Sequence, residues 1–224
     1  MAQRIVPFVL DEYYHIYNRG NSKQIIYKND CDYERFMQLL YLSNGTKSFK
    51  VRELGKQNPY EVDMGESVVA IGAYCLMPNH FHILLKPLVE GGISIFMKKL
   101  STGYSMYFNK KYKRTGSLFE GKFKSKHVSS DTYLKYLFSY IHLNPVKLLQ
   151  LDWREKGIND LQTAISYLEK YKYSSYIDQI PTGLSCGERS ESAIINTSPF
   201  PDYSEELKGG ITDIIEWLEY EEEN

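Results

Sequence analysis

Residues 67–87, "SVVAIGAYCLMPNHFHILLKP", predict a β-hairpin at the centre of the fold. Residues 67–77 and 80–87 are apolar runs of strand length, and the Pro-Asn pair between them is a turn signal. Side chains alternate between the two faces of a strand, so His80 and His82 share one face while their neighbours enter the core. The hairpin therefore presents two imidazoles side by side.

The segments around the hairpin complete a ferredoxin-like pattern. Before it, a strand is predicted over 13–20 and a helix over 29–44; after it come a helix over 92–112 and a strand over 116–128. A further helix is predicted over 130–149. The order β-α-β-β-α-β-α is a split βαβ unit with an added helix. We therefore expect an α+β fold, with an antiparallel sheet and helices on one face.

The character of the chain changes after residue 150, which predicts two units. Residues 1–150 carry the ferredoxin-like pattern, and residues 151–224 form a C-terminal helical extension with an acidic tail. Within the extension, a helix is predicted over 159–176. Residues 181–204 resemble a linker rich in Ser, Pro and Gly, and residues 205–224 predict an acidic amphipathic helix.

Composition favours a soluble protein of the cytoplasm. Of the 224 residues, 42% are hydrophobic and 25% charged, which suits a packed core with a solvated surface. No apolar run approaches the roughly 18 residues of a membrane span, and the N-terminus makes a poor signal peptide. The three cysteines are far apart and form no CxxC pair, which indicates a reducing compartment.

Positive charge is concentrated in one part of a chain whose net charge is only −1. Residues 98–127 hold nine basic side chains against a single acidic one, Glu120. This pattern is typical of a site for a polyanion such as nucleic acid, although a solvated helix face also produces it. The candidate phosphate contacts are Lys98, Lys99, Lys110, Lys111, Lys113, Arg114, Lys122, Lys124 and Lys126.

The histidine pair can be interpreted in two ways. Neutral imidazoles on one exposed sheet face form half of a metal site, since their nitrogens suit several divalent metals. Two separate packing and hydrogen-bonding roles are the alternative, and spacing alone favours that alternative.

The helix over 130–149 carries a second set of polar side chains on one face. Tyr136, Tyr140 and Asn144 follow one another at four-residue spacing, so each lies one turn from the next. Pro145 cannot donate a hydrogen bond within the helix, so the helix loosens or ends there. This predicts that Asn144 is a positioned polar group beside Tyr140, or else part of a terminating turn.

Four segments in this order resemble the single-tyrosine HUH transposases, which are insertion-sequence-200-like. They are "MPNHFHILLKP" (77–87), the basic helix, "GSLFEGKFKSKHV" (116–128) and "YIHLNPVKLL" (140–149). His80-Phe81-His82 fits the His-hydrophobic-His motif. "YYHIYNRGN" (13–21) resembles the first strand of the REP-associated tyrosine transposases, which are the most similar branch. The resemblance spans roughly residues 10–150.

The resemblance implies a chemistry and a set of roles. His80 and His82 would bind a divalent metal, Mg or Mn, with Asn144 as a third ligand. Tyr140 would be the nucleophile, and Tyr136 is the competing candidate one turn earlier. The implied activity is that of a DNA transposase. It cleaves and rejoins single-stranded or hairpin DNA through a 5′-phosphotyrosine intermediate.

The implied partner is DNA, and no membrane is expected as a partner. The protein would act as a monomer or a homodimer. Arg19 joins the nine basic residues as a candidate DNA contact, although a turn role is equally consistent with its position after the first strand.

Three other readings compete with this one. A ferredoxin-like sheet with aromatic residues is also the plan of many non-catalytic nucleic-acid-binding modules. A relaxase or replication initiator of the HUH type shares the chemistry but often carries further histidines or paired tyrosines. A domesticated host enzyme has the same sequence features as a mobile one.

Overall fold

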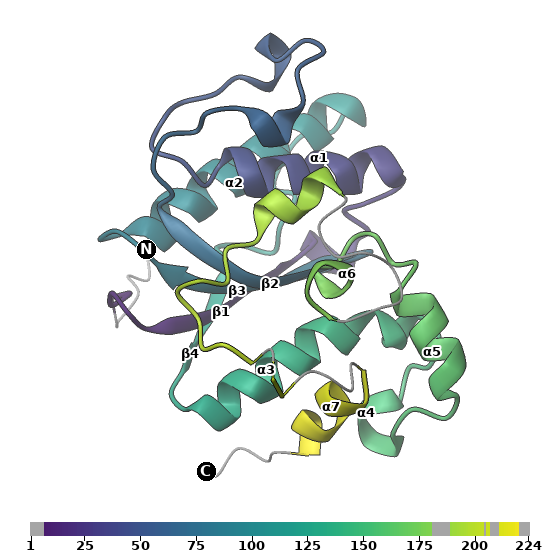
Figure 1. Ribbon diagram of the computed structural model, residues 1–224. Helices are drawn as coiled ribbons and strands as arrows, with labels where there is room; N and C mark the ends of the chain where they lie inside the picture. Colours follow the sequence, from purple (N-terminus) through teal and green to yellow (C-terminus); the bar gives the residue numbers. More distant parts are fainter. Residues whose placement is uncertain (1–6, 181–188, 204, 207–210, 220–224) are drawn as a thin grey trace.

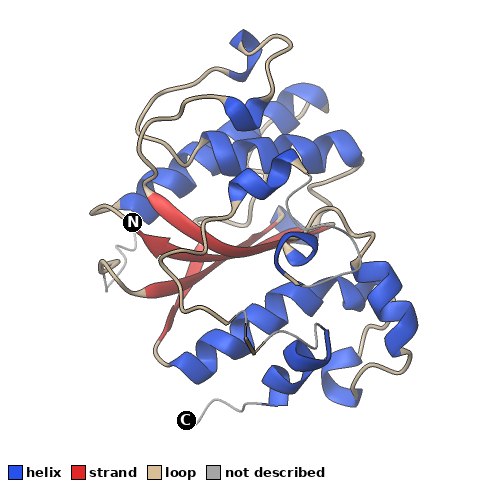
Figure 2. Cartoon of the chain, viewed as in Figure 1, coloured by secondary structure: helices blue, strands red, loops and turns tan. Residues whose placement is uncertain are grey.

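A four-stranded antiparallel sheet in the order β2-β3-β1-β4 forms the centre of the computed structural model (Figure 1, Figure 2). The structure describes residues 7–180, 189–203, 205–206 and 211–219. With one helix after β1 and one after β3, this is the predicted ferredoxin-like arrangement, and the α+β class is confirmed. The strands are β1 (Tyr13–Arg19), β2 (Val69–Met77), β3 (His80–Pro87) and β4 (Lys124–Val128).

The predicted hairpin is confirmed as β2 and β3. The two strands pair in antiparallel register from Val69 opposite Pro87 to Met77 opposite His80, so only Pro78 and Asn79 form the connection. All nine residues of β2 are buried, although β2 is an edge strand of the sheet. Other parts of the chain must therefore cover its outer edge.

Helices cover both faces of the sheet (Figure 1). Helices α1 (Asp30–Leu42) and α2 (Gly92–Lys111) pack on one face, and α3 (Asp131–Leu143) packs on the other. The core between the sheet and the first pair includes Phe36 and Phe81, whose ring centroids are 5.1 Å apart. Three short 3₁₀ turns precede β2: η1 (Asn21–Lys23), η2 (Val51–Glu53) and η3 (Pro59–Glu61).

Two elements are shorter than predicted. Helix α3 ends at Leu143, and the chain continues as the 3₁₀ turn η4 (Asn144–Leu148), because Pro145 has no amide hydrogen to extend the α-helical pattern. The strand predicted over 116–128 begins only at Lys124. Gly116 and Gly121 adopt positive φ values of 83° and 158°, which end regular strand geometry before that point.

The C-terminal extension wraps around the outer edge of β2. The amide of Leu76 donates to the carbonyl of Tyr173 at 3.0 Å, and the amide of Ser175 donates to the carbonyl of Tyr74 at 3.0 Å. Further along, the amide of Asn196 donates to the carbonyl of Ile71 at 3.0 Å. These bonds satisfy an edge that would otherwise be open.

The elements of the extension differ in part from the predicted ones. The helix predicted over 159–176 stops at residue 168, and part of the linker-like segment forms the turn η5. Residues 181–188, 204, 207–210 and 220–224 lie outside the described residues, so the acidic helix is described only as α7 and η6. The elements are α4 (Trp153–Lys156), α5 (Leu161–Leu168), α6 (Tyr176–Gln179), η5 (Ser190–Ile194), α7 (Ile211–Glu216) and η6 (Trp217–Glu219).

The division into 1–150 and 151–224 stays a prediction. Trp217, which directly follows α7, packs against α3. The centroid of its ring lies 6.0 Å from that of Phe138. Within the described residues, no helix combines the length and apolar character needed to cross a membrane.

Candidate functional site

The alternation of β3 places both histidines of the pair on the face covered by α3. Phe81 and Ile83 point to the opposite face and are fully buried. The register with β1 sets Tyr17 opposite His82 and Arg19 opposite His80. Side chains from two neighbouring strands therefore meet on this face.

A third histidine, His15 of β1, joins the pair. Its Nε2 lies 2.8 Å from Nδ1 of His82, and the two rings stack with their centroids 5.0 Å apart. Sequence reasoning did not identify His15. Its face follows from strand alternation, but its contact with His82 depends on the β1–β3 register, which the sequence does not reveal.

Hydrogen bonds fix which nitrogens of the imidazoles are committed. Nδ1 of His80 lies 2.6 Å from Oδ1 of Asn79. Because an amide oxygen only accepts, Nδ1 of His80 carries the proton and Nε2 keeps its lone pair. The Nδ1 of His82 is occupied by His15. Each histidine of the pair thus has its Nε2 left for another partner.

All three histidines are neutral at physiological pH. Burial lowers the pKa of His15 and of His80 to about 4. Burial also lowers the pKa of His82 well below its ordinary value, and the nearby His15 and His80 act in the same direction. Neutral imidazole is the form that binds a metal.

Tyr140 of α3 faces these histidines. Its ring centroid is 5.3 Å from that of His82 and 6.3 Å from that of His15, and both contacts are edge-to-face. Burial raises the pKa of Tyr140, while a hydrogen bond with Asn144 and the positive charge of Arg154 act against that increase. Asn144 is 3% exposed and lies where α3 ends, so the helix terminus positions it beside Tyr140.

Tyr136 lies one turn before Tyr140, and the two rings are parallel with their centroids 6.3 Å apart. Its hydroxyl accepts a hydrogen bond from Arg154. Tyr136 does not line the cleft that holds the histidine pair. Geometry therefore separates the two candidate nucleophiles: Tyr140 lines the cleft with the histidines, whereas Tyr136 lies outside it.

A cleft of about 430 Å³ opens over this cluster. It joins the histidine pair and Tyr140 to cations from three different elements. Of the predicted DNA contacts, it includes Arg19 and Lys124. The lining residues are Tyr17, Asn18, Arg19, Asn79, His80, Phe81, His82, Glu120, Lys124, Tyr140 and Lys147.

Strand β4 brings basic residues to the same face. Lys124 pairs with Tyr17 and Lys126 pairs with His15, so both lysines share the face of the histidines. The ammonium of Lys126 lies over the ring of Tyr133 at 4.5 Å. Lys122 is exposed just before the strand. Arg19 is paired with Glu120 at 2.8 Å, so its charge is partly compensated within the cleft.

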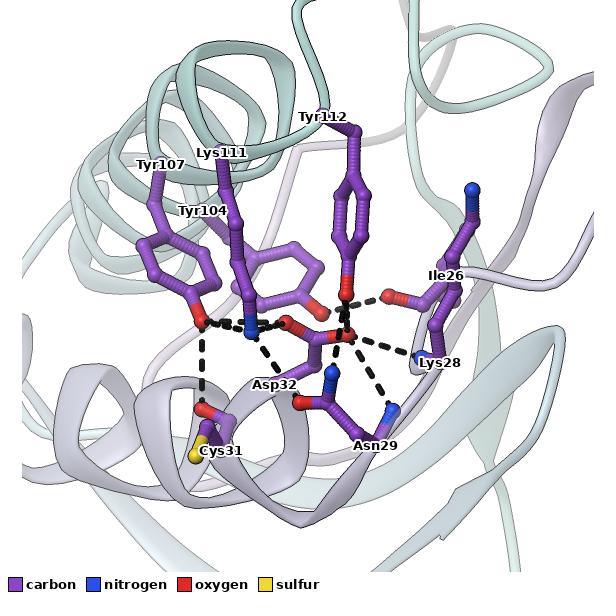
Figure 3. A network of polar contacts seen from close by, with 9 residues as sticks. All are labelled: Ile26, Lys28, Asn29, Cys31, Asp32, Tyr104, Tyr107, Lys111 and Tyr112. Carbon is purple, nitrogen blue, oxygen red and sulfur yellow. Dashed lines mark hydrogen bonds and ion pairs between the residues drawn. The ribbon is translucent and has the colours of Figure 1, made fainter.

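The predicted DNA contacts on and just after α2 lie on the far side of the sheet, and two of them have partners inside the protein. Lys99 donates to the carbonyl of Gly45 at 2.5 Å. Lys111 donates to Oδ1 of Asp32 at 2.7 Å, in a network that joins α2 to the start of α1 (Figure 3). None of this group lines the cleft; its members are Lys98, Lys99, Lys110, Lys111, Lys113 and Arg114.

Asp32, at the centre of that network, is fully buried and accepts five hydrogen bonds (Figure 3). Burial acts to raise its pKa, but the hydrogen bonds outweigh burial and the pKa of Asp32 is lowered. Burial acts to lower the pKa of Lys111, but its hydrogen bond with Asp32 outweighs burial and the pKa of Lys111 is raised. The donors are the amides of Lys28 and Asn29, the ammonium of Lys111 and the hydroxyls of Tyr107 and Tyr112.

The donor set at the histidines suits a divalent metal. Among the described residues, no group of three or more His, Cys, Asp or Glu side chains is arranged to hold one. His15 does not supply a third imidazole, since its Nε2 is turned to His82. The set is instead two neutral imidazoles, each anchored through Nδ1, with the amide of Asn144 hydrogen-bonded to Tyr140. Imidazole nitrogens suit transition metals such as Zn, and an amide oxygen suits Mg or Mn.

Part of the chain matches the model of a known family. Residues 63–144 match the family model described as "Transposase IS200 like". A solved structure, "Structure of the REP associates tyrosine transposase bound to a REP hairpin", resembles the chain at 14% identity and a TM-score of 0.49. That resemblance covers 84% of this chain and 98% of the other. No curated protein sequence matches the chain.

Proposed function

We propose that this chain, whose residues 63–144 match the model of the IS200-like transposases, cleaves and rejoins one strand of DNA with Tyr140 as nucleophile. One observation carries the proposal: the Tyr140 ring lies 5.3 Å from His82, in a cleft that also contains Lys124 and Lys147. A half-buried phenol beside anchored imidazoles and lysine side chains is suited to attack on a phosphodiester.

The cations of the cleft support DNA as substrate. Lysine and arginine bind backbone phosphates independently of sequence. Single-stranded or hairpin DNA is the proposed form, as in the family.

We assign the divalent metal of the family, Mg or Mn, to His80, His82 and Asn144. When bound, such an ion polarises a phosphate oxygen and neutralises charge that develops in the transition state. The residues around it have their own task. Asn79 and His15 fix the orientation of the two imidazoles through their Nδ1 atoms.

The covalent step exchanges one phosphoester bond for another. The phenol of Tyr140 loses its proton, and its oxygen attacks phosphorus while the bond to the 3′-oxygen breaks. The leaving oxygen takes up a proton and becomes a free 3′-hydroxyl, and the 5′-phosphate stays on Tyr140. A second strand with a 3′-hydroxyl reverses the step, so rejoining needs no external energy source.

The test is a covalent-adduct assay with both ends of the DNA labelled in turn. Hairpin oligonucleotides from the genomic flanks of the gene are incubated with the protein in Mg or Mn, or in EDTA. A 5′-phosphotyrosine retains the strand on the 3′ side of the cut, so only the 3′ label shifts to the protein band. The 5′ label is released as a shorter strand that ends in a 3′-hydroxyl.

Two variants serve as matched controls. Tyr140→Phe should give no adduct, whereas Tyr136→Phe should keep it. An adduct that survives in Tyr140→Phe and disappears in Tyr136→Phe contradicts the assignment of the nucleophile. Tight, salt-sensitive binding without any adduct in the wild type contradicts catalysis and favours a non-catalytic nucleic-acid-binding module.

A further inference from the structure

Arg154 contacts both tyrosines of the site from an element that neither the family match nor the sequence-based assignment includes. The guanidinium carbon lies 4.8 Å from the ring centroid of Tyr140, and Nη2 donates to the hydroxyl of Tyr136. Arg154 belongs to the four-residue helix α4, outside residues 63–144. The C-terminal extension therefore reaches the proposed nucleophile.

The position of Arg154 is fixed by its neighbour in the chain. Trp153 is 2% exposed and packs in the core, which anchors the first turn of α4 although the helix is short. The other long cation of this turn, Lys156, pairs with Asp152. Arg154 forms no ion pair with a described carboxylate, so its guanidinium is left to the two tyrosines.

Arginine is well suited to make both contacts at once. Its guanidinium is planar, so the flat face stacks on an aromatic ring while the N–H groups donate in the plane. Here the guanidinium lies over the ring of Tyr140, and Nη2 donates to the hydroxyl of Tyr136. Arg154 therefore occupies the hydroxyl of Tyr136 but contacts only the ring of Tyr140, whose hydroxyl interacts with Asn144.

We propose that Arg154 is a positioning residue that selects Tyr140 over Tyr136 as the nucleophile. This inference rests on the proposed function, because it concerns which tyrosine attacks. The two rings are parallel and one turn apart, so the helix alone presents two similar phenols. Arg154 makes them unequal by tethering one hydroxyl and fixing the ring of the other.

The first experiment maps the covalent adduct in Arg154→Gln and Arg154→Lys. Trypsin cleavage after Lys135 and Lys147 releases both tyrosines in one peptide, "YLFSYIHLNPVK" (136–147), whose fragmentation distinguishes them. In Arg154→Gln, adduct formation should slow by about 10–100-fold with little change in KM, since misplaced groups lose rate rather than binding. A share of the adduct should move to Tyr136. Arg154→Lys should recover part of the rate, because an ammonium keeps the positive charge near the Tyr140 ring but lacks the planar fork that holds both contacts in one geometry.

The second experiment needs neither DNA nor metal. N-acetylimidazole acetylates accessible tyrosine hydroxyls, and peptide mass spectrometry reports each site. Tyr136 should be modified several-fold faster in Arg154→Gln than in the wild type, while the matched control Lys156→Gln should leave its rate unchanged. Far-ultraviolet circular dichroism confirms that each variant is folded, and Arg154→Lys alone carries the test if Arg154→Gln is not.

The outcomes separate this inference from the proposed function. An absence of adduct in every protein, the wild type included, contradicts the proposed function, and the acetylation rates then decide whether Arg154 tethers Tyr136. If Arg154→Gln and Lys156→Gln have the same adduct rate, adduct position and acetylation rates, the role of Arg154 is overturned.

Discussion

The two faces of the sheet use polar residues in opposite ways. On the α1/α2 face, the Asp32 carboxylate accepts five hydrogen bonds, and one of them comes from Lys111, with which it forms an ion pair (Figure 3). On the α3 face, Lys124 and Lys147 border the histidine cleft and form no ion pair with a described carboxylate. Charge on the first face stabilises the fold, and charge on the second is available to a ligand.

This comparison shows why a run of basic residues in a sequence is ambiguous. The run over 98–127 is continuous along the chain, yet the sheet divides it. Its α2 part lies on the opposite face of the sheet from α3 (Figure 1), and its β4 part lies on the histidine face. Whether a lysine binds phosphate or a buried carboxylate depends on a partner that is distant in sequence.

The largest contrast between the faces is expected from His82→Ala and Asp32→Ala. His82→Ala should reduce metal-dependent adduct formation by at least about 100-fold, because even residues that only orient a ligand contribute 10–100-fold. Unfolding should remain cooperative, with a loss of about 1–2 kcal/mol for one buried ring and its hydrogen bond. Adduct assays and urea denaturation check both expectations. Near-normal activity in His82→Ala would contradict the role of the histidine face.

Asp32→Ala should show the reverse pattern in stability. It removes a buried charge with five donors, so the free energy of unfolding should fall by about 3–5 kcal/mol. The matched control is Glu120→Ala, which removes a carboxylate from a partly exposed pair with Arg19 and should cost far less stability. Urea denaturation of the two variants tests the comparison. Equal losses would mean that the Asp32 network does not stabilise the fold as described.

The pH dependence of stability should identify the same carboxylate. The pKa of Asp32 is lower in the folded chain than in the unfolded chain, so its contribution is complete above the unfolded pKa of about 3.9. That contribution is lost as the pH falls through the lower folded pKa. Between pH 5 and pH 3, the wild type should therefore lose more stability than Asp32→Asn. Parallel pH profiles of the two proteins would contradict the lowered pKa.

The smallest expected effect concerns the two kinds of lysine. Lys124→Gln should weaken binding to single-stranded DNA and reduce the slope of log affinity against log salt by about 0.7, the value for one phosphate contact. Lys111→Met should leave that slope unchanged and lower the free energy of unfolding instead, because Lys111 forms an ion pair with the buried Asp32. Fluorescence anisotropy at several salt concentrations measures the slope. A reduced slope in Lys111→Met would mean that α2 also contacts DNA.

Local pattern was enough to predict most of the fold. The hairpin at 67–87 and the helices around it follow from apolar periodicity and turn residues, and these fix the ferredoxin-like order. The start of β4 was predicted less well, because Gly121 acts on one or two residues at a time, whereas Pro145 marks the end of α3 in the sequence. The course of the extension around β2 depends on edge hydrogen bonds that no local pattern encodes.

The candidate site was predictable only where residues lie close in sequence. His80 and His82 are two residues apart, and Tyr140 and Asn144 are one turn apart, so their shared faces follow from geometry. His15 reaches His82 through strand register. Arg154 reaches Tyr140 through the anchoring of Trp153. Both are tertiary contacts, and neither leaves a signal in the spacing of residues.

The most direct test of the account is to locate the covalent bond itself. The wild-type protein is reacted with a hairpin substrate in Mn, digested with nuclease and trypsin, and the peptide over 136–147 is fragmented in a mass spectrometer. We expect a nucleotide phosphate on Tyr140 and an unmodified Tyr136. A nucleotide on Tyr136, or a cleaved strand with neither tyrosine modified, would contradict Tyr140 as the nucleophile.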